Sequence, residues 1–170
     1  MSSTPALSPL TGSVTVALPV DRAFAFFTGS FGRWWPADYH IGGAEMADAV
    51  IEPREGGRWY ERGTDGTECD WGRVLAWEPP HRLVVTWQIN GLWQYDPDPE
   101  HASEIEVRFT PVGPAQTRVD LEHRHLDRLV EGAALRDGIE AGGGGWNSTL
   151  AAYAKAAEAD RRAPTGPGAP

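Results

Sequence analysis

Apolar and polar residues alternate at every second position over much of the chain, which is the pattern of β-strands that bury one face. The alternation predicts seven strands, at residues 13–18, 47–51, 57–61, 70–77, 82–89, 103–109 and 117–125. Turn-forming residues separate them, as at Gly63-Thr64-Asp65-Gly66 and at Pro79-Pro80. The strands are therefore expected to form one antiparallel sheet.

Helical periodicity is found in three segments. The first two, residues 21–28 and 31–36, are short and lie between the first and second strands. The third begins at Gly145-Trp146 and runs to about Ala157, and its apolar stripe consists of Trp146, Leu150, Tyr153, Ala154 and Ala157. Because that stripe must be buried, we expect this long C-terminal helix to lie across the concave face of a curved sheet.

A sheet that curves around a helix tends to enclose a cavity. The inward faces of the strands and the stripe of the helix both carry large rings and apolar side chains. The predicted ligand-binding residues are Trp59, Trp71, Trp87, Phe109, Leu121, His123, Trp146, Leu150 and Tyr153. Such walls suit a flat or polycyclic hydrophobic molecule. The alternative is that these tryptophans fill the core beneath the helix.

Length and composition indicate one domain. The chain has 170 residues, of which 41% are hydrophobic, and this is enough for a single core. We assign the domain to residues 11–160. Residues 1–10 and 161–170 are expected to be disordered, because segments rich in serine, proline and glycine bury too little apolar area to offset their ordering entropy.

The charge and the cysteine content of the chain limit which partners and which kinds of site it can have. A formal net charge of −9 argues against nucleic acid or an anionic membrane as a partner. Cys69 is the single cysteine, which excludes an intrachain disulfide and a cysteine-rich zinc site. No apolar run reaches the roughly 18 residues that a membrane span needs, and no export signal is found. A cytoplasmic protein is expected, and a homodimer is compatible with the sequence.

Two histidines are the strongest candidates for chemistry. His123 and His125 would share one face of the last strand, where they could transfer a proton or orient a polar group of a ligand, with Glu61 or Arg73 nearby. Partly buried structural histidines are the alternative. Two histidines are only half of a zinc ligand set, so no metal and no cofactor is predicted. Ser148 lies inside the predicted helix and no GxSxG motif is present, so no nucleophile is assigned.

Several short motifs carry a family resemblance. They are Trp34-Trp35-Pro36, Gly56-Gly57-Arg58-Trp59, Leu83-Val84-Val85-Thr86-Trp87 and Gly145-Trp146 with Leu150. Together with the order of the elements, they resemble the SRPBCC or START-like helix-grip superfamily, in the branch homologous to the activator of the heat-shock-protein-90 ATPase. The resemblance covers about residues 11–159. It implies an α+β fold of the START or birch-pollen-allergen type, with a curved antiparallel seven-stranded sheet around a long C-terminal helix and two short helices after the first strand.

A closer similarity is to the calicheamicin self-resistance proteins of enediyne producers. The segments that carry it are Trp34-Trp35-Pro36, Gly56 to Glu61, Asn90-Gly91, Asp96-Pro97-Asp98, Ser103-Glu104, Thr117 to Asp120 and Glu122-His123. The similarity implies that a backbone glycine, Gly113 in this chain, gives up an α-hydrogen to the drug's diradical, so that the protein is cleaved in place of DNA. Pro114 beside it alters that loop, and Gly113 could instead only turn a hairpin.

The favoured hypothesis is non-catalytic binding of a hydrophobic or aromatic small molecule in an internal cavity. Enediyne self-resistance, by sequestration or self-sacrifice, is the specific form that the resemblance implies. Two alternatives stay open. One is an enzyme of the polyketide cyclase or hydrolase kind, and the other is an interaction module that acts with a chaperone.

Overall fold

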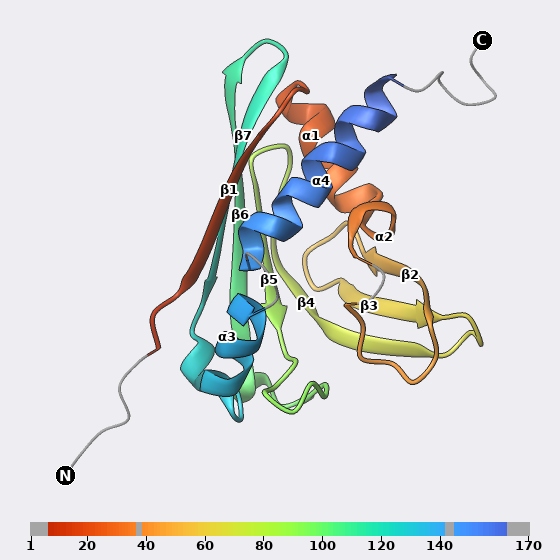
Figure 1. The fold of residues 1–170 in the computed structure, drawn as a ribbon, viewed down its shortest axis with the longest axis vertical. Coiled ribbons are helices and arrows are strands. Elements are labelled where there is room, and N and C mark those ends of the chain that lie inside the picture. The colour runs from red at the N-terminus through yellow and green to blue at the C-terminus, as the bar shows by residue number, and fades with distance from the viewer. Residues whose placement is uncertain (1–6, 37–38, 142–144, 163–170) are drawn as a thin grey trace.

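The computed structural model describes residues 7–36, 39–141 and 145–162. Within these residues, seven strands form one antiparallel sheet in the order β1-β7-β6-β5-β4-β3-β2. The strands are β1 (Leu10–Val16), β2 (Met46–Ile51), β3 (Arg58–Gly63), β4 (Glu68–Glu78), β5 (Arg82–Trp87), β6 (Ser103–Gly113) and β7 (Gln116–Arg124). The sheet curls into a half-barrel, as predicted (Figure 1).

Four α-helices complete the described part of the chain. Two short ones, α1 (Val20–Gly29) and α2 (Phe31–Trp34), follow β1 as predicted, and α4 (Gly145–Arg162) crosses the inner side of the sheet (Figure 1). Helix α3 (Gly132–Ala141) was not predicted. Glycine stands at its first and seventh positions, Gly132 and Gly138, which weakens the helical signal, and Leu135 is its one fully buried large side chain. Short 3₁₀ turns, η1 (Pro99–His101) and η2 (Leu126–Arg128), flank β6 and β7.

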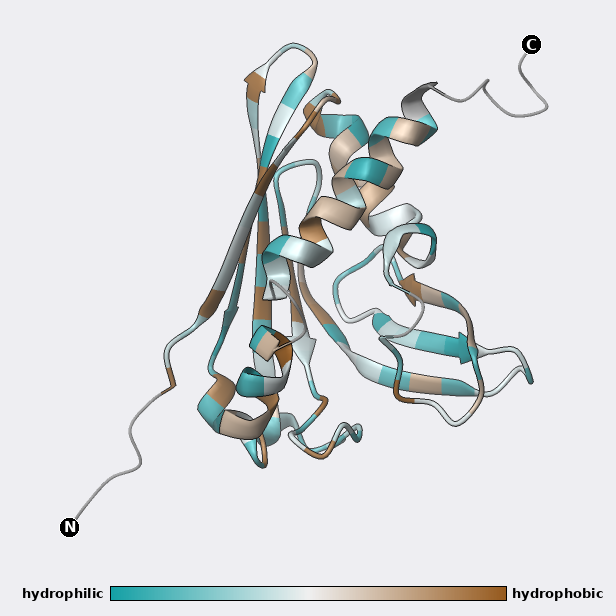
Figure 2. Cartoon of the chain, viewed as in Figure 1, coloured by the Kyte–Doolittle hydropathy of each residue, from teal (hydrophilic) through white to brown (hydrophobic). Residues whose placement is uncertain are grey.

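The core lies between α4 and the concave face of the sheet. Apolar and polar residues alternate along the long strands and along α4 (Figure 2). Leu150, Tyr153 and Ala157 of the predicted stripe are buried. The Tyr153 hydroxyl donates a hydrogen bond to the Ala23 carbonyl at 2.8 Å, which ties α4 to α1. Burial of this large ring with its polar atom satisfied holds α4 against α1.

Every strand differs from the prediction at one end or both, by one to four residues, and the ends of β1, β5 and β7 change where particular side chains lie. β1 starts at Leu10 and ends at Val16, so Leu18 lies outside it. β5 ends at Trp87, because the Gln88 backbone bonds to Trp71 and Asp96 instead of continuing the β5–β6 ladder. β7 ends at Arg124, and His125 has a left-handed φ of 61°. The prediction that His123 and His125 share one strand face is therefore wrong.

The predicted ends of the domain fall partly outside the described residues. Of the segments expected to be disordered, residues 1–6 and 163–170 are not described, whereas Leu10 is the first residue of β1. Among the described residues, no helix combines the length and apolar character needed to cross a membrane.

Candidate functional site

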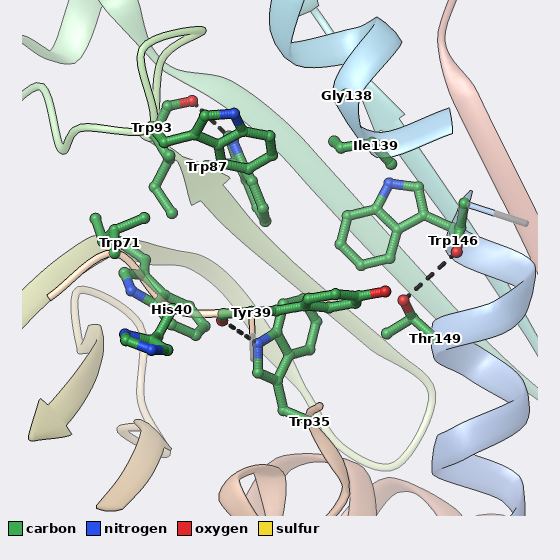
Figure 3. Close-up of a pocket in the computed structure, with 13 residues that line it drawn as sticks. Trp35, Tyr39, His40, Trp71, Trp87, Trp93, Gly138, Ile139, Trp146 and Thr149 are labelled. Carbon is green, nitrogen blue, oxygen red and sulfur yellow. Dashed lines mark hydrogen bonds between the residues drawn. The ribbon is translucent and has the colours of Figure 1, made fainter. Parts of the chain in front are cut away.

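A cavity of about 300 Å³ lies where α3 and α4 meet the sheet. Aromatic side chains from five parts of the chain line it, as Figure 3 shows. They are Trp35 and Tyr39 after α2, Trp71 of β4, Trp87 of β5, Trp93 in the loop after β5, and Trp146 of α4. His40, Ile139 and Thr149 are also part of the lining. The site is thus a pocket with aromatic walls and few polar groups.

Hydrogen bonds hold three of these six rings in place. The indole Nε1 of Trp35 donates to the Tyr39 carbonyl at 2.8 Å, and that of Trp87 donates to the Ile89 carbonyl at 2.9 Å. Trp71 Nε1 donates to Glu61 Oε1 at 2.9 Å. Rings fixed in this way lose little freedom when a ligand binds, so the walls are pre-organised.

Trp146 differs from these three indoles. Its buried Nε1 has no hydrogen-bond partner in the described part of the chain. Its ring lies edge-on to Trp87, with a centroid separation of 5.9 Å, and is tilted against Trp35 at the same separation. Thr149 stands one turn further along α4, where its hydroxyl bonds to the Gly145 carbonyl. This indole N–H is therefore a buried polar group left unsatisfied beside the cavity.

A buried carboxylate lies behind the wall. Glu61 is 1% exposed and accepts hydrogen bonds from the Ile41 and Gly42 amides as well as from Trp71. His40 Nδ1 lies 3.7 Å from Glu61 Oε2. The sequence hypothesis placed Glu61 near His123, but the structure places it beside His40. The signal for Glu61 was an acidic residue on the inward face of a strand, whereas nothing in the sequence marked His40.

His123 is fully buried behind the pocket wall and is not part of the lining. Its ring packs against Trp87 and Trp146, with centroids 5.1 Å and 5.7 Å away. Ser103 Oγ uses its one proton to donate to the Trp87 carbonyl. It must therefore accept in its 2.9 Å contact with His123 Nε2, which places the ring proton on Nε2. Burial lowers the pKa of His123 to about 3, so the ring is neutral at pH 7. His123 therefore positions two wall residues.

The structure brings together only some of the predicted ligand-binding residues. Trp71, Trp87 and Trp146 line the cavity, and Trp59 packs edge-on behind Trp71 at a centroid separation of 5.3 Å. The remaining predicted residues lie in the core, namely Phe109, Leu121, Leu150 and Tyr153. Lining residues that were not predicted from the sequence are Trp35, Tyr39, His40, Trp93, Ile139 and Thr149. Of these, Trp35 belongs to a motif that carried the family resemblance.

Gly113 lies far from the cavity. It ends β6 and pairs with Gln116 in the hairpin at the top of Figure 1, beside the exposed Val112. Ser103, at the other end of β6, hydrogen-bonds to the cavity residue Trp87. Strand residues advance about 3.3 Å each, which puts Gly113 roughly 30 Å from that end.

No cluster of three or more His, Cys, Asp or Glu side chains suited to a metal ion occurs among the described residues. The chemical groups at the site are aromatic walls, a few hydrogen-bonding groups and the pair formed by His40 and Glu61.

A curved sheet that grips a C-terminal helix, with a cavity between them, defines a helix-grip protein of the SRPBCC superfamily. More specifically, the chain belongs to the family described as Activator of Hsp90 ATPase homolog 1-like protein, whose model matches residues 17–158. No curated protein matches the chain.

Two solved structures are similar to this chain in both sequence and fold. An anthrahydroquino-γ-pyrone synthase, Txn09, is 41% identical, with 90% of this chain and 99% of that chain covered and a TM-score of 0.64. The self-sacrificing resistance protein CalC from Micromonospora echinospora is 32% identical, with 89% and 95% covered and a TM-score of 0.66. Protein NE0264 from Nitrosomonas europaea, at 16% identity, 90% and 96% coverage and a TM-score of 0.62, shares the fold.

Proposed function

We propose that the protein binds a flat, polycyclic aromatic small molecule in the cavity between α4 and the sheet. The observation that carries this proposal is a cavity of about 300 Å³ walled by five tryptophans and a tyrosine. Clefts of this size and apolar character are typical of small-molecule sites. Aromatic rings pack favourably against a planar ligand in offset or edge-on arrangements. Binding without turnover is the simplest form of this function.

The relatives support the same ligand class. Txn09 is named for an anthrahydroquinone fused to a pyrone, and it covers nearly the whole of this chain at 41% identity. A ligand with fused aromatic rings and phenolic or quinone oxygens is therefore the class we propose. The same likeness favours a second candidate function, in which the pocket is that of a ring-forming enzyme of the polyketide cyclase kind.

The binding proposal predicts that a planar probe such as 2-hydroxyanthraquinone quenches the tryptophan fluorescence and raises the melting temperature. Replacing Trp146 by alanine removes one wall, so we expect the affinity for the probe to fall about tenfold or more, equivalent to about 1.4 kcal/mol. Isothermal titration calorimetry measures the loss.

Trp77→Leu is the matched control for this experiment. Trp77 is partly buried, packs on Phe24 and does not line the cavity. The control variant should keep the wild-type affinity even if its stability falls. Equal affinities for the wild type and for Trp146→Ala would contradict binding in this cavity.

CalC supports a third, more specific form of the function, which is resistance to an enediyne. Sequestration would use the aromatic cavity, whereas self-sacrifice would use the backbone at Gly113. These two sites lie at opposite ends of β6, so one bound drug molecule in the cavity would not reach Gly113 by proximity alone. The chaperone-associated alternative rests on the description of the family alone.

A further inference from the structure

Burying a carboxylate such as that of Glu61 costs free energy unless hydrogen-bond donors compensate for the lost water. Its two oxygens receive three N–H donors, at 2.7 Å from Ile41, 3.1 Å from Gly42 and 2.9 Å from Trp71. Every one of these partners donates, which matches an ionised carboxylate, since that group only accepts. Gly42 is required for this approach, because a Cβ there would stand 2.7 Å from Glu61 Oε2. The backbone after His40 is thus wrapped around a buried negative charge.

His40 faces this carboxylate with one defined nitrogen. Its Nδ1 lies 3.2 Å from the Gly42 carbonyl oxygen and 3.7 Å from Glu61 Oε2. Both oxygens can only accept, so Nδ1 carries a ring proton, and in the neutral imidazole Nε2 holds the lone pair. The side chain is 25% exposed and belongs to the cavity lining, beside Trp71 in the view of Figure 3. A histidine whose Nδ1–H is held by a backbone carbonyl, with a carboxylate 3.7 Å behind it and Nε2 left for a ligand, has the arrangement of a general base.

Among the side chains in and next to the pocket, His40 and Glu61 are the pair best suited to acid–base chemistry. Cys69 pairs with Glu61 across β3 and β4, and burial together with the charge of Glu61 raises the pKa of its thiol, which stays neutral. Tyr39, next to His40, also lines the cavity and offers a hydroxyl. The remaining lining residues are apolar apart from Thr149 and the indole N–H groups.

We propose that His40 and Glu61 form an acid–base pair that takes the proton of a phenolic hydroxyl on the bound aromatic ligand. His40 Nε2 accepts the proton, the O–H bond breaks, and its electron pair stays on the ligand oxygen as a phenolate. The imidazolium that forms is stabilised by the Glu61 carboxylate, and the reverse step returns the proton. His40 is the catalytic residue and Glu61 the positioning residue. This inference rests on the proposed binding function and supplies the proton transfer that a ring-forming enzyme would need.

The test uses 2-hydroxyanthraquinone, whose visible absorption moves to longer wavelength when its phenol ionises. An apolar pocket alone would raise the pH at which the bound probe ionises, because burial disfavours the charged form. With the acid–base pair present, the midpoint of the bound probe should lie about one pH unit or more below that of the free probe, a tenfold effect. In His40→Gln and Glu61→Gln the midpoint should return to the free value or rise above it.

A matched control is available in the second histidine–carboxylate pair of the chain. His101 Nδ1 lies 2.8 Å from Asp96 Oδ2 in a pair that is not part of the cavity lining. His101→Gln should leave the probe midpoint unchanged. His40 follows α2 in a loop and is partly exposed, so His40→Gln is expected to fold, and circular dichroism verifies this.

The possible failures are distinguishable. If the probe neither quenches fluorescence nor raises the melting temperature, the binding function is overturned and the acid–base role with it. If the probe binds but ionises at or above its free midpoint in the wild type, the acid–base role alone is overturned. The same holds if His40→Gln binds the probe and keeps the lowered midpoint.

Discussion

At the scale of single residues, the polar groups around the cavity divide by what they contact. His40 lines the cavity and can reach a ligand, whereas His123 is sealed behind two tryptophans. In each histidine a neighbouring oxygen identifies a nitrogen that carries a proton, Nδ1 in His40 and Nε2 in His123. The difference in exposure gives them different roles. One is available for proton transfer, and the other contributes to stability in a pH-dependent way.

We predict that His123 makes the protein sensitive to mild acid. Its pKa is lowered by burial to about 3 in the folded state, against about 6.5 in an unfolded chain. Between these values the unfolded state binds more protons, so the free energy of unfolding falls as the pH falls, by up to about 1.4 kcal/mol per pH unit. In His123→Leu, the contribution of His123 to the pH dependence of the free energy of unfolding should be missing between pH 6 and pH 4. Urea denaturation across that range measures it.

Glu106 provides an internal reference for this measurement. Although burial opposes it, hydrogen bonds from Arg82, Arg124 and Arg108 lower the pKa of Glu106 to about 2. Stability from that carboxylate is likewise lost as the pH falls, but below about pH 4.5 and equally in both proteins. It therefore cancels in the comparison. Parallel stability curves for the wild type and His123→Leu would contradict the assignment.

At the scale of elements, one close approach sets the position of α4. Gly12 of β1 lies beneath the start of the helix, where an added Cβ would stand 3.0 Å from Trp146 Cβ and 3.1 Å from the Trp146 backbone. The helix can reach its place over the sheet because this residue has no side chain. Trp146 both contacts Gly12 and lines the cavity. The position of α4 on the sheet and the shape of the cavity are therefore coupled.

This coupling predicts that Gly12→Ala loses both stability and affinity. The added methyl group must push α4 outward, which costs about 1–3 kcal/mol for an overpacked core position. Trp146 moves with the helix, so the affinity for 2-hydroxyanthraquinone should fall as well. Gly29→Ala is the control, because a Cβ at Gly29 meets nothing within 4 Å and alanine favours the helix in which it lies. Thermal unfolding and calorimetry should separate the two variants, and equal behaviour would disprove the coupling.

At the scale of the whole molecule, periodicity predicts which face of an element is buried but not where along its length a cavity opens. Tyr153 and Trp146 belong to one stripe of α4, yet Trp146 borders the cavity while Tyr153 packs between Phe27 and Trp34. The sheet, its seven strands and the gripping helix were predictable because alternation and helical spacing are local properties. Trp93 and His40 were not, because loops are placed by tertiary contacts that leave no periodic signal.

The separation of the two ends of β6 gives a last prediction, for exposure to an activated enediyne. If the chain is sacrificed at Gly113, intact-mass analysis should show a cut near that residue, about 30 Å from the cavity end of the strand. Preloading the cavity with 2-hydroxyanthraquinone should then leave the cut unprotected, because the drug acts at the hairpin. If the drug instead binds in the cavity, the preloaded ligand should compete with it and Gly113→Ala should change nothing. An uncut chain under conditions that cleave DNA would remove self-sacrifice and leave sequestration in the aromatic cavity as the form of resistance to test.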